Sequence, residues 1–190
     1  LDAIPPDTAV DIADLGTGSG AIALALAIER PLAHITATDI SGAALSKARE
    51  NAKRLGLDIQ FVEGDWFAPL KGRRFDAIVS NPPYVRWNDP ALETTPARFE
   101  PATALFAGED GLDCIRALCA NLKHHVKAGG LVALEHGHDQ QDAVHALLSA
   151  AGLESIVRVN DQAGLARVTS ARMPYCCLLY TSDAADELRS

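Results

Sequence analysis

The alternation of short apolar runs with helical patterns constrains the fold of this 190-residue chain more than any other feature. Strand–helix–strand units form right-handed crossovers, and repeated crossovers build a parallel sheet with helices on both faces. Runs of strand length lie at 10–15, 34–40, 58–65, 74–81, 131–137, 153–159 and 166–172, and helical patterns lie at 21–30, 42–56, 110–127 and 139–151. The sequence therefore predicts an α/β fold with a doubly wound, mostly parallel, seven-stranded sheet.

The last two runs indicate a different connection. Only "NDQAGL" separates 153–159 from 166–172, which is too short for a crossover and favours an antiparallel hairpin at one edge of the sheet. In a doubly wound sheet, ligands bind at the carboxyl ends of the strands, near the point where the strand order reverses. We therefore look for functional residues directly after the predicted strands.

Composition favours one globular domain, which we expect over residues 1–173 and in monomeric form. The chain is 48% hydrophobic and 22% charged, and its net charge of −8 argues against binding to nucleic acid or to an anionic membrane surface. No apolar run approaches the roughly 20 residues of a membrane span. The four cysteines fit neither a zinc site nor a disulfide framework, so we expect a reducing, cytoplasmic location.

The C-terminal segment "PYCCLLYTSDAADELRS", residues 174–190, continues none of the periodicity before it. We expect it to be foreign to the domain, derived from a vector or from sequence read past the true end of the gene. A native disordered tail is the alternative.

A glycine cluster follows the first predicted strand, in "DLGTGSGAIALA". Gly16, Gly18 and Gly20 allow the backbone to approach a ligand closely, and Thr17 and Ser19 lie between them. The spacing is not the dinucleotide pattern, and no phosphate-binding lysine follows it. The cluster predicts a cofactor loop, with a tight strand–helix turn that binds no ligand as the alternative.

Two further strand ends carry candidate cofactor residues. Asp39 ends the second strand, 19 residues after Gly20. An acid at about this spacing from a glycine loop bonds the ribose hydroxyls of an adenosine-containing ligand. Its alternative role is to cap the helix that starts near Ser41. After the third strand, in "GDWF", Asp65 can accept from an adenine amine and Trp66 can form a wall for the ring. A core position is the alternative for Trp66.

The fourth strand ends in "SNPPY". Two prolines stop the strand and stiffen the chain that leaves it. The side chain of Asn81 and the carbonyl of Pro82 offer two acceptors that suit an NH₂ group, while Tyr84 can stack on a flat substrate and exclude water. Hydrogen bonds from the poorly nucleophilic nitrogen of this NH₂ group to both acceptors orient it towards a methyl donor. An ordinary proline turn is the alternative.

The combination of "DLGTGSG", "TATD", "GDWF", "SNPPY", "RFEPATALFAGEDGLD" and "LEHG" closely resembles the HemK/PrmC family of protein-glutamine methyltransferases, over about residues 9–172. The resemblance implies a Rossmann-like class I methyltransferase fold with a C-terminal antiparallel hairpin. It further implies methylation of the glutamine side-chain amide in the Gly-Gly-Gln motif of peptide chain release factors, with S-adenosyl-L-methionine as the cofactor and the release factor as the partner.

The resemblance also assigns roles to single residues. Gly16 to Gly20 would hold the methionine part of the cofactor, Asp39 the ribose, and Trp66 the adenine end. Asn81 would touch both cofactor and substrate, and Pro82, Pro83 and Tyr84 would frame the glutamine; Asn81, Pro82 and Tyr84 are thus the expected catalytic group. The family's small helical N-terminal domain is absent, so we expect the chain to be a fragment.

Two other functions stay open. An exocyclic-amine methyltransferase acting on DNA or RNA uses the same Asn-Pro-Pro-aromatic corner, and an inactive cofactor-binding fragment would keep only the loop. Glu135 and His136, at the end of the fifth strand, are expected to make structural hydrogen bonds rather than to act in catalysis. We expect no metal, because the sulfonium leaving group departs neutral.

Overall fold

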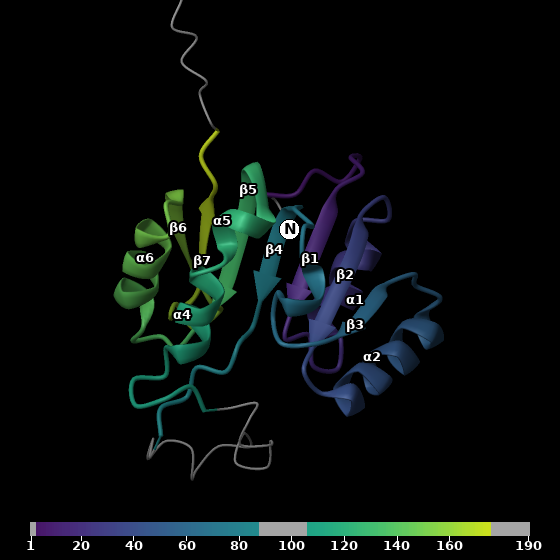
Figure 1. The fold of residues 1–190 in the computed structure, drawn as a ribbon, viewed down its shortest axis with the longest axis horizontal. Coiled ribbons are helices and arrows are strands. Elements are labelled where there is room, and N and C mark those ends of the chain that lie inside the picture. Colours follow the sequence, from purple (N-terminus) through teal and green to yellow (C-terminus); the bar gives the residue numbers. More distant parts are fainter. Residues whose placement is uncertain (1–2, 88–105, 176–190) are drawn as a thin grey trace, which may run out of the picture.

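The computed structural model describes residues 3–87 and 106–175, and these form one mixed sheet flanked by helices (Figure 1). The sheet has seven strands in the order β3-β2-β1-β4-β5-β7-β6. The elements are β1 Asp11–Leu15, α1 Ala21–Glu29, β2 His34–Asp39, α2 Gly42–Leu55, β3 Gln60–Glu63, η1 Ala68–Leu70, β4 Phe75–Ser80, α4 Asp113–Cys119, α5 Leu122–His125, β5 Val126–Glu135, α6 Gln141–Ala150, β6 Glu154–Asn160 and β7 Ala166–Arg172.

The strand pairing confirms the predicted topology. Strands β3, β2, β1, β4 and β5 pair in parallel. Strand β7 pairs antiparallel with both β5 and β6, so the C-terminal hairpin sits at the edge beyond β5. The strand order reverses between β1 and β4, and this is the point where doubly wound sheets bind their ligands.

Alternating side chains of the central strands build two cores, one on each face of the sheet. Ile12 belongs to the core that contains Ala23 and Leu26 of α1. Its neighbour Ala13 belongs to the opposite core, which contains Leu118 of α4 and residues of α5 and α6. Period-two alternation of this kind follows from the pleat of a strand that is covered on both sides.

The helix predicted over 110–127 is wrong at its C-terminal end. The structure has two short helices there, α4 and α5, and β5 already begins at Val126. Val126 is fully buried and pairs with Phe75 of β4. Beside it, the Lys127 ammonium lies 2.8 Å from a carboxylate oxygen of Asp11 and 2.7 Å from one of Asp76. These contacts with β1 and β4 hold residues 126 and 127 in an extended strand. A helical pattern within one segment carries no information about such contacts with distant strands.

Parts of two predictions lie outside the described residues. Most of the proline-rich segment before Gly108 falls in 88–105, and so does the start of "RFEPATALFAGEDGLD". The expected foreign tail, 174–190, is described only at Pro174 and Tyr175. Within 3–87 and 106–175, no helix is both long enough and apolar enough to cross a membrane.

Candidate functional site

The register of the sheet brings the predicted site residues to one edge. Leu15 pairs with Thr38 of β2 and with Ser80 of β4, so the glycine loop, Asp39 and the corner after β4 leave the sheet at the same level. Asp39 pairs with Glu63, which places the turn with Asp65 and Trp66 next in line. Four neighbouring strand ends therefore carry all the candidate residues, on both sides of the reversal in strand order.

The glycine loop is held in a shape that only glycine adopts readily. Gly16, Gly18 and Gly20 have φ angles of 69°, 58° and 90°. A Cβ at Gly16 would lie 3.0 Å from the Trp66 ring, and one at Gly20 would lie 3.1 Å from Ala48. A Cβ at Gly18 would meet nothing within 4 Å. The loop is thus packed at its ends and open at its middle, where a ligand can approach the backbone.

Asp39 fastens this loop to the end of β2. One carboxylate oxygen accepts from the Gly18 backbone N–H at 2.8 Å, and the other accepts from the Ser41 N–H at 2.8 Å. Ser41 itself caps α2, because its side chain accepts from the Ala44 N–H. Asp39 is only half-buried, and each of its oxygens retains a further acceptor position. It can therefore both shape the loop and receive hydroxyl groups from a ligand.

Asp14 is a candidate site residue that the sequence reasoning missed. Its side chain is fully buried below the loop, where one oxygen accepts from the Thr17 hydroxyl at 2.6 Å and from the Ala23 N–H at 3.1 Å. The other oxygen has no hydrogen-bond partner. Burial raises the pKa of Asp14 to about 6, and the negative charge of Asp39 adds to the rise. The signal was an acidic residue between the apolar Ala13 and Leu15, at the end of the strand "DIADL" that runs into the glycine cluster.

The structure places Trp66 beside the glycine loop and Asp65 at the surface. Trp66 has a φ of 42°, in the left-handed region that non-glycine residues rarely adopt. Its carbonyl accepts from the Thr38 hydroxyl at 3.2 Å, and its ring edge lies against Gly16. The half-buried ring also packs against the core, so Trp66 can belong to the core and still form one wall of a ligand site. Asp65 is exposed.

The corner after β4, residues 81–84, leaves the sheet as predicted. Ser80 ends the strand, and its hydroxyl donates to the Leu15 carbonyl at 2.7 Å, which ties the corner to the start of the glycine loop. Asn81 is exposed and Pro82 is buried, while Pro83 and Tyr84 are half-buried. An exposed amide beside a buried proline is suited to contact a ligand above the strand ends.

The end of β5 contributes two residues to this edge. Tyr84 donates from its hydroxyl to Glu135 at 3.4 Å, a long and weak hydrogen bond. His136 is fully buried between the Thr169 hydroxyl and the Gly137 carbonyl, at 2.8 Å from each. The structural hydrogen bonds expected for His136 are therefore present, whereas Glu135 faces the corner.

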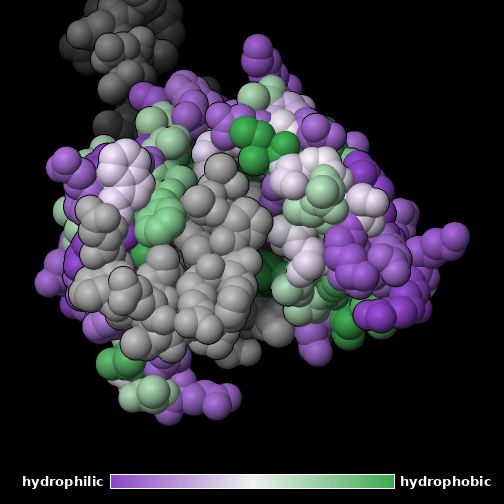
Figure 2. All heavy atoms as spheres, turned by 90° about the horizontal axis from the view of Figure 1, so that it is seen from below, coloured by the Kyte–Doolittle hydropathy of each residue, from purple (hydrophilic) through white to green (hydrophobic). Residues whose placement is uncertain are grey.

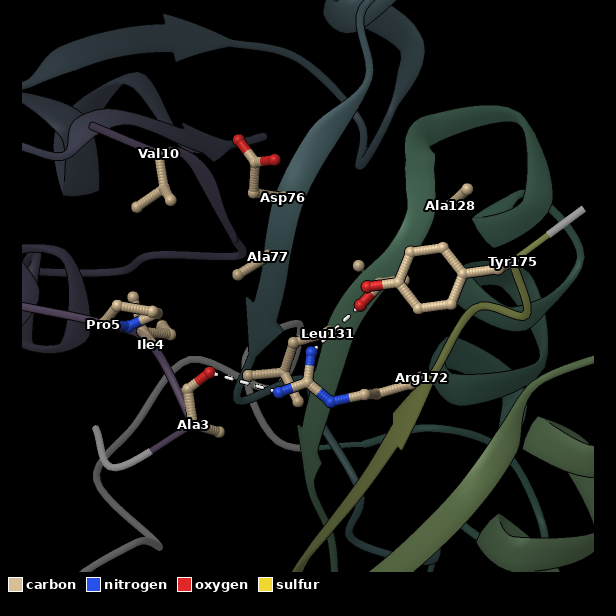
Figure 3. Close-up of a pocket in the computed structure, with 12 residues that line it drawn as sticks. Ala3, Ile4, Pro5, Val10, Asp76, Ala77, Ala128, Leu131, Arg172 and Tyr175 are labelled. Atoms are coloured by element: carbon tan, nitrogen blue, oxygen red, sulfur yellow. Dashed lines mark hydrogen bonds between the residues drawn. The ribbon is translucent and has the colours of Figure 1, made fainter. Parts of the chain in front are cut away.

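The end of the molecule that carries these residues is shown in Figure 2, where hydrophilic side chains gather along the right-hand side, over α2. A cavity of about 190 Å³ lies at the opposite end of the strands (Figure 3). Arg172 bridges part of it by donating to the carbonyls of Ala3 and Gly129. None of the predicted site residues lines this cavity, so we do not associate it with the candidate site.

The chemistry of the site fits an adenosine-containing cofactor with a cationic group. The open backbone at Gly18 and the acceptor positions of Asp39 suit a ribose and its attached chain. The unpaired oxygen of Asp14, buried below the loop, suits a positively charged partner. Among the residues that the structure describes, no group of three or more His, Cys, Asp or Glu side chains is placed to hold a metal ion.

Comparison with known proteins gives a consistent picture. Residues 1–109 match the model of the methyltransferase small domain. Release factor glutamine methyltransferase of Xylella fastidiosa is 52% identical over 164 residues, which are 86% of this chain and 60% of the relative. The enzyme of the same name from Vibrio cholerae is 47% identical and covers 84% of this chain and 56% of the relative. The chain thus spans little more than half the length of these relatives.

Solved structures agree on the fold. A methyltransferase from Pyrococcus furiosus superposes with a TM-score of 0.68 at 19% identity, over 90% of this chain and 78% of that one. The match supports the class I methyltransferase fold that the sequence resemblance implied.

Proposed function

Because the chain belongs to the methyltransferase small domain family, we propose that it transfers a methyl group from S-adenosyl-L-methionine to a glutamine side-chain amide. The proposed substrate is the Gly-Gly-Gln motif of a peptide chain release factor. Relatives of 47–52% identity carry the name release factor glutamine methyltransferase. The observation that carries the proposal is the Asn-Pro-Pro-Tyr corner beside the glycine loop, at the reversal of strand order.

We assign cofactor binding to the strand ends of β1, β2 and β3. The loop from Gly16 to Gly20 receives the methionine part, Asp39 the ribose hydroxyls, and Asp65 and Trp66 the adenine. The unpaired Asp14 oxygen supplies negative charge beneath the loop. When bound, the cofactor supplies a methyl group made electrophilic by its positively charged sulfur. The protein's part is to hold that methyl group in line with the incoming nitrogen.

We assign substrate binding to the corner. The Asn81 side-chain oxygen and the Pro82 carbonyl accept the two N–H groups of the glutamine amide, which turns its nitrogen towards the methyl donor. In the transfer the C–N bond would form as the methyl–sulfur bond breaks, the sulfur would leave as a neutral thioether, and the nitrogen would release one N–H proton to solvent. As the nitrogen gains positive charge, both acceptors bind its hydrogens more strongly, and this differential stabilisation accelerates the reaction. Pro83 and Tyr84 frame the flat amide and exclude water. The prolines keep both acceptors in place before the substrate arrives.

A direct test supplies labelled S-adenosyl-L-methionine with three acceptors in parallel: a purified release factor, its Gly-Gly-Gln peptide, and DNA and RNA oligonucleotides. We expect label on the protein and the peptide only, and none on a Gly-Gly-Ala peptide as the matched control. Label on an oligonucleotide would favour the exocyclic-amine reaction, which shares the same corner. Cofactor binding without any transfer would indicate an inactive binding domain.

A further inference from the structure

Gln140 joins the corner to two other segments through one buried amide. Gln140 is 3% exposed and lies between β5 and α6. Its side-chain nitrogen lies 3.0 Å from the Tyr84 carbonyl, 3.1 Å from the Asp110 carbonyl and 3.2 Å from the Gly111 carbonyl. Its side-chain oxygen accepts from the Gly137 N–H at 2.8 Å. One amide thus binds the backbone of the corner, the turn before α4 and the loop after β5.

The Gly111 backbone packs so closely against Tyr84 and Gln140 that no side chain fits between them. A Cβ at Gly111 would lie 2.3 Å from the Tyr84 carbonyl oxygen and 2.6 Å from the Gln140 side-chain nitrogen. Gly111 also has a φ of 74°, which favours glycine. The backbone of the turn therefore lies directly against the backbone of the corner, and Gln140 occupies the point where they meet.

Two other contacts link the segment 84–86 to the end of β5 and to the β5–α6 loop, and both are weaker. Arg86 and Asp139 form an ion pair of 2.6 Å, but both side chains are nearly half exposed, and exposed ion pairs contribute little. The hydrogen bond from Tyr84 to Glu135 is 3.4 Å long. The Gln140 amide is buried and makes its contacts at 2.8–3.2 Å, so it holds the corner more firmly than either of these contacts.

We propose that Gln140 is a positioning residue for methyl transfer, which acts through the Tyr84 carbonyl and touches neither cofactor nor substrate. The inference rests on the proposed function. The anchored carbonyl is two residues beyond the Pro82 carbonyl that receives the substrate amide, and the rigid ring of Pro83 between them transmits its position. A displacement of about 1 Å at a reacting group costs on the order of 100-fold in rate. Releasing the corner should therefore lower the rate and leave the glycine loop unaffected.

The test compares two isosteric changes in adjacent residues, Gln140→Glu and Gln141→Glu. Gln140→Glu keeps the side-chain shape but replaces the donor to the three carbonyls by an acceptor. Gln141 lies beside Arg158, and among the described residues its side chain makes no hydrogen bond to the corner, so Gln141→Glu is the matched control. For Gln140→Glu we expect kcat on the Gly-Gly-Gln peptide to fall about 10- to 100-fold, with the Kd for S-adenosyl-L-methionine within about twofold of the parent value. The control should match the parent in both.

A second readout requires no substrate. The Trp87 N–H donates to the Gly108 carbonyl and the Ala107 N–H to the Val85 carbonyl, each at 3.0 Å, directly after the corner. Hydrogen exchange at Trp87 and Ala107 should accelerate about tenfold or more in Gln140→Glu and stay unchanged in Gln141→Glu, because a released corner opens locally. Amides in β1 and α1 should exchange at the parent rate.

The outcomes separate the inference from the proposed function. If the parent protein methylates no release-factor peptide, the proposed function fails, and hydrogen exchange alone decides whether Gln140 holds the corner. Parent-like kcat and exchange in Gln140→Glu would overturn the inference. The inference would also be overturned if the affinity for S-adenosyl-L-methionine fell as much as kcat, because Gln140 would then support the whole domain rather than the corner. If Gln140→Glu does not fold, Gln140→Met removes the donor at similar length and is judged by the same readings.

Discussion

The two halves of the candidate site are held in different ways. The cofactor half is fastened by residues close in sequence: Asp14 binds Thr17 three positions away, and Asp39 binds Gly18 across 21 positions. The corner depends on residues more than 50 positions away, since Tyr84 is bound by Gln140 and Glu135. The hydrogen bonds that shape the glycine loop therefore span short stretches of sequence, with the Trp66 ring packed against Gly16, whereas the corner depends on contacts with distant segments.

The largest expected effect comes from Asn81→Ala in the substrate half. The change removes one of two preorganised acceptors that strengthen as the substrate nitrogen gains charge, and a loss of this kind costs about 100- to 1,000-fold in turnover. Single-turnover methylation of a release factor or its Gly-Gly-Gln peptide measures it. Cofactor affinity should change much less than the rate. Asn160→Ala, at the exposed end of β6, is the matched control.

Asn81→Asp sharpens the same test. It keeps an acceptor but adds a negative charge, which attracts the cofactor's positive sulfur before the reaction begins. Cofactor binding should then tighten or stay equal while turnover falls, because the ground state gains more than the transition state. A variant with parent-like turnover would show that the corner is only a proline turn and would contradict the proposed mechanism.

Asp14→Asn tests the cofactor half through stability. In the parent, the folded pKa of Asp14 is raised to about 6 from 3.8, so between these values the folded protein keeps a proton that the unfolded chain has released. Stability therefore falls as pH rises from about 4 to 6, by at most about 3 kcal/mol from this group at 1.36 kcal/mol per unit. An Asn side chain does not ionise, so Asp14→Asn lacks this loss of stability at higher pH. We expect Asp14→Asn to be more stable than the parent at pH 7 and equal to it below pH 4.

The same variant should lose affinity for S-adenosyl-L-methionine, because its neutral amide no longer attracts a cation. Stability and binding then move in opposite directions, as expected where a buried charge is retained for function. Urea unfolding at pH 4 and pH 7, with calorimetric titration of the cofactor, measures both. Equal stability of the two proteins at pH 7 would show that the buried carboxylate carries no penalty.

Asp39→Ala removes the acceptor for the Gly18 N–H and the proposed acceptor for the ribose together. We expect cofactor binding to weaken by about 1.5–3 kcal/mol, the scale of hydrogen bonds to a charged group. Asp58→Ala, an exposed acid before β3, is the control. Unchanged affinity by calorimetry would count against the ribose assignment. Turnover at saturating cofactor should stay near the parent value, since Asp39 makes no hydrogen bond to the corner among the described residues.

The same contrast explains how much of the molecule the sequence could predict. The seven-stranded, mostly parallel sheet, the hairpin and the turn of Gly16, Gly18 and Gly20 follow from local patterns and turn chemistry, and the structure confirms them. Asn81 and Pro82 could be placed because two prolines end a strand by covalent geometry alone. The end of the helix predicted to 127 could not be placed, because the pairing of Val126 with Phe75 overrides a local helical pattern.

Asp14 and Gln140, the two residues that the sequence reasoning missed, also differ in whether the local sequence gives a signal for them. Asp14 left a signal, an acidic residue between the apolar Ala13 and Leu15, which is rarely buried without a partner. Gln140 left none, because a polar residue at the start of a helix is normally solvated. Only the fold brings its amide within 3.0–3.2 Å of carbonyls from residues 84, 110 and 111. Supports of this kind emerge from tertiary packing and have no sequence motif of their own.

The smallest expected effect, from Tyr84→Phe, decides which contact holds the corner. The change keeps the ring proposed to frame the substrate and the carbonyl that Gln140 binds, and it removes the 3.4 Å hydrogen bond from the phenol to Glu135. A net contribution of about 0.5 kcal/mol, the low end for a hydrogen bond, corresponds to roughly a twofold change. Peptide KM and kcat should therefore stay within about threefold of the parent values. If Tyr84→Phe were instead as damaging as Asn81→Ala, the phenol rather than the backbone would position the substrate half. The corner would then depend on Glu135, and the anchoring role of Gln140 would have to be reassigned.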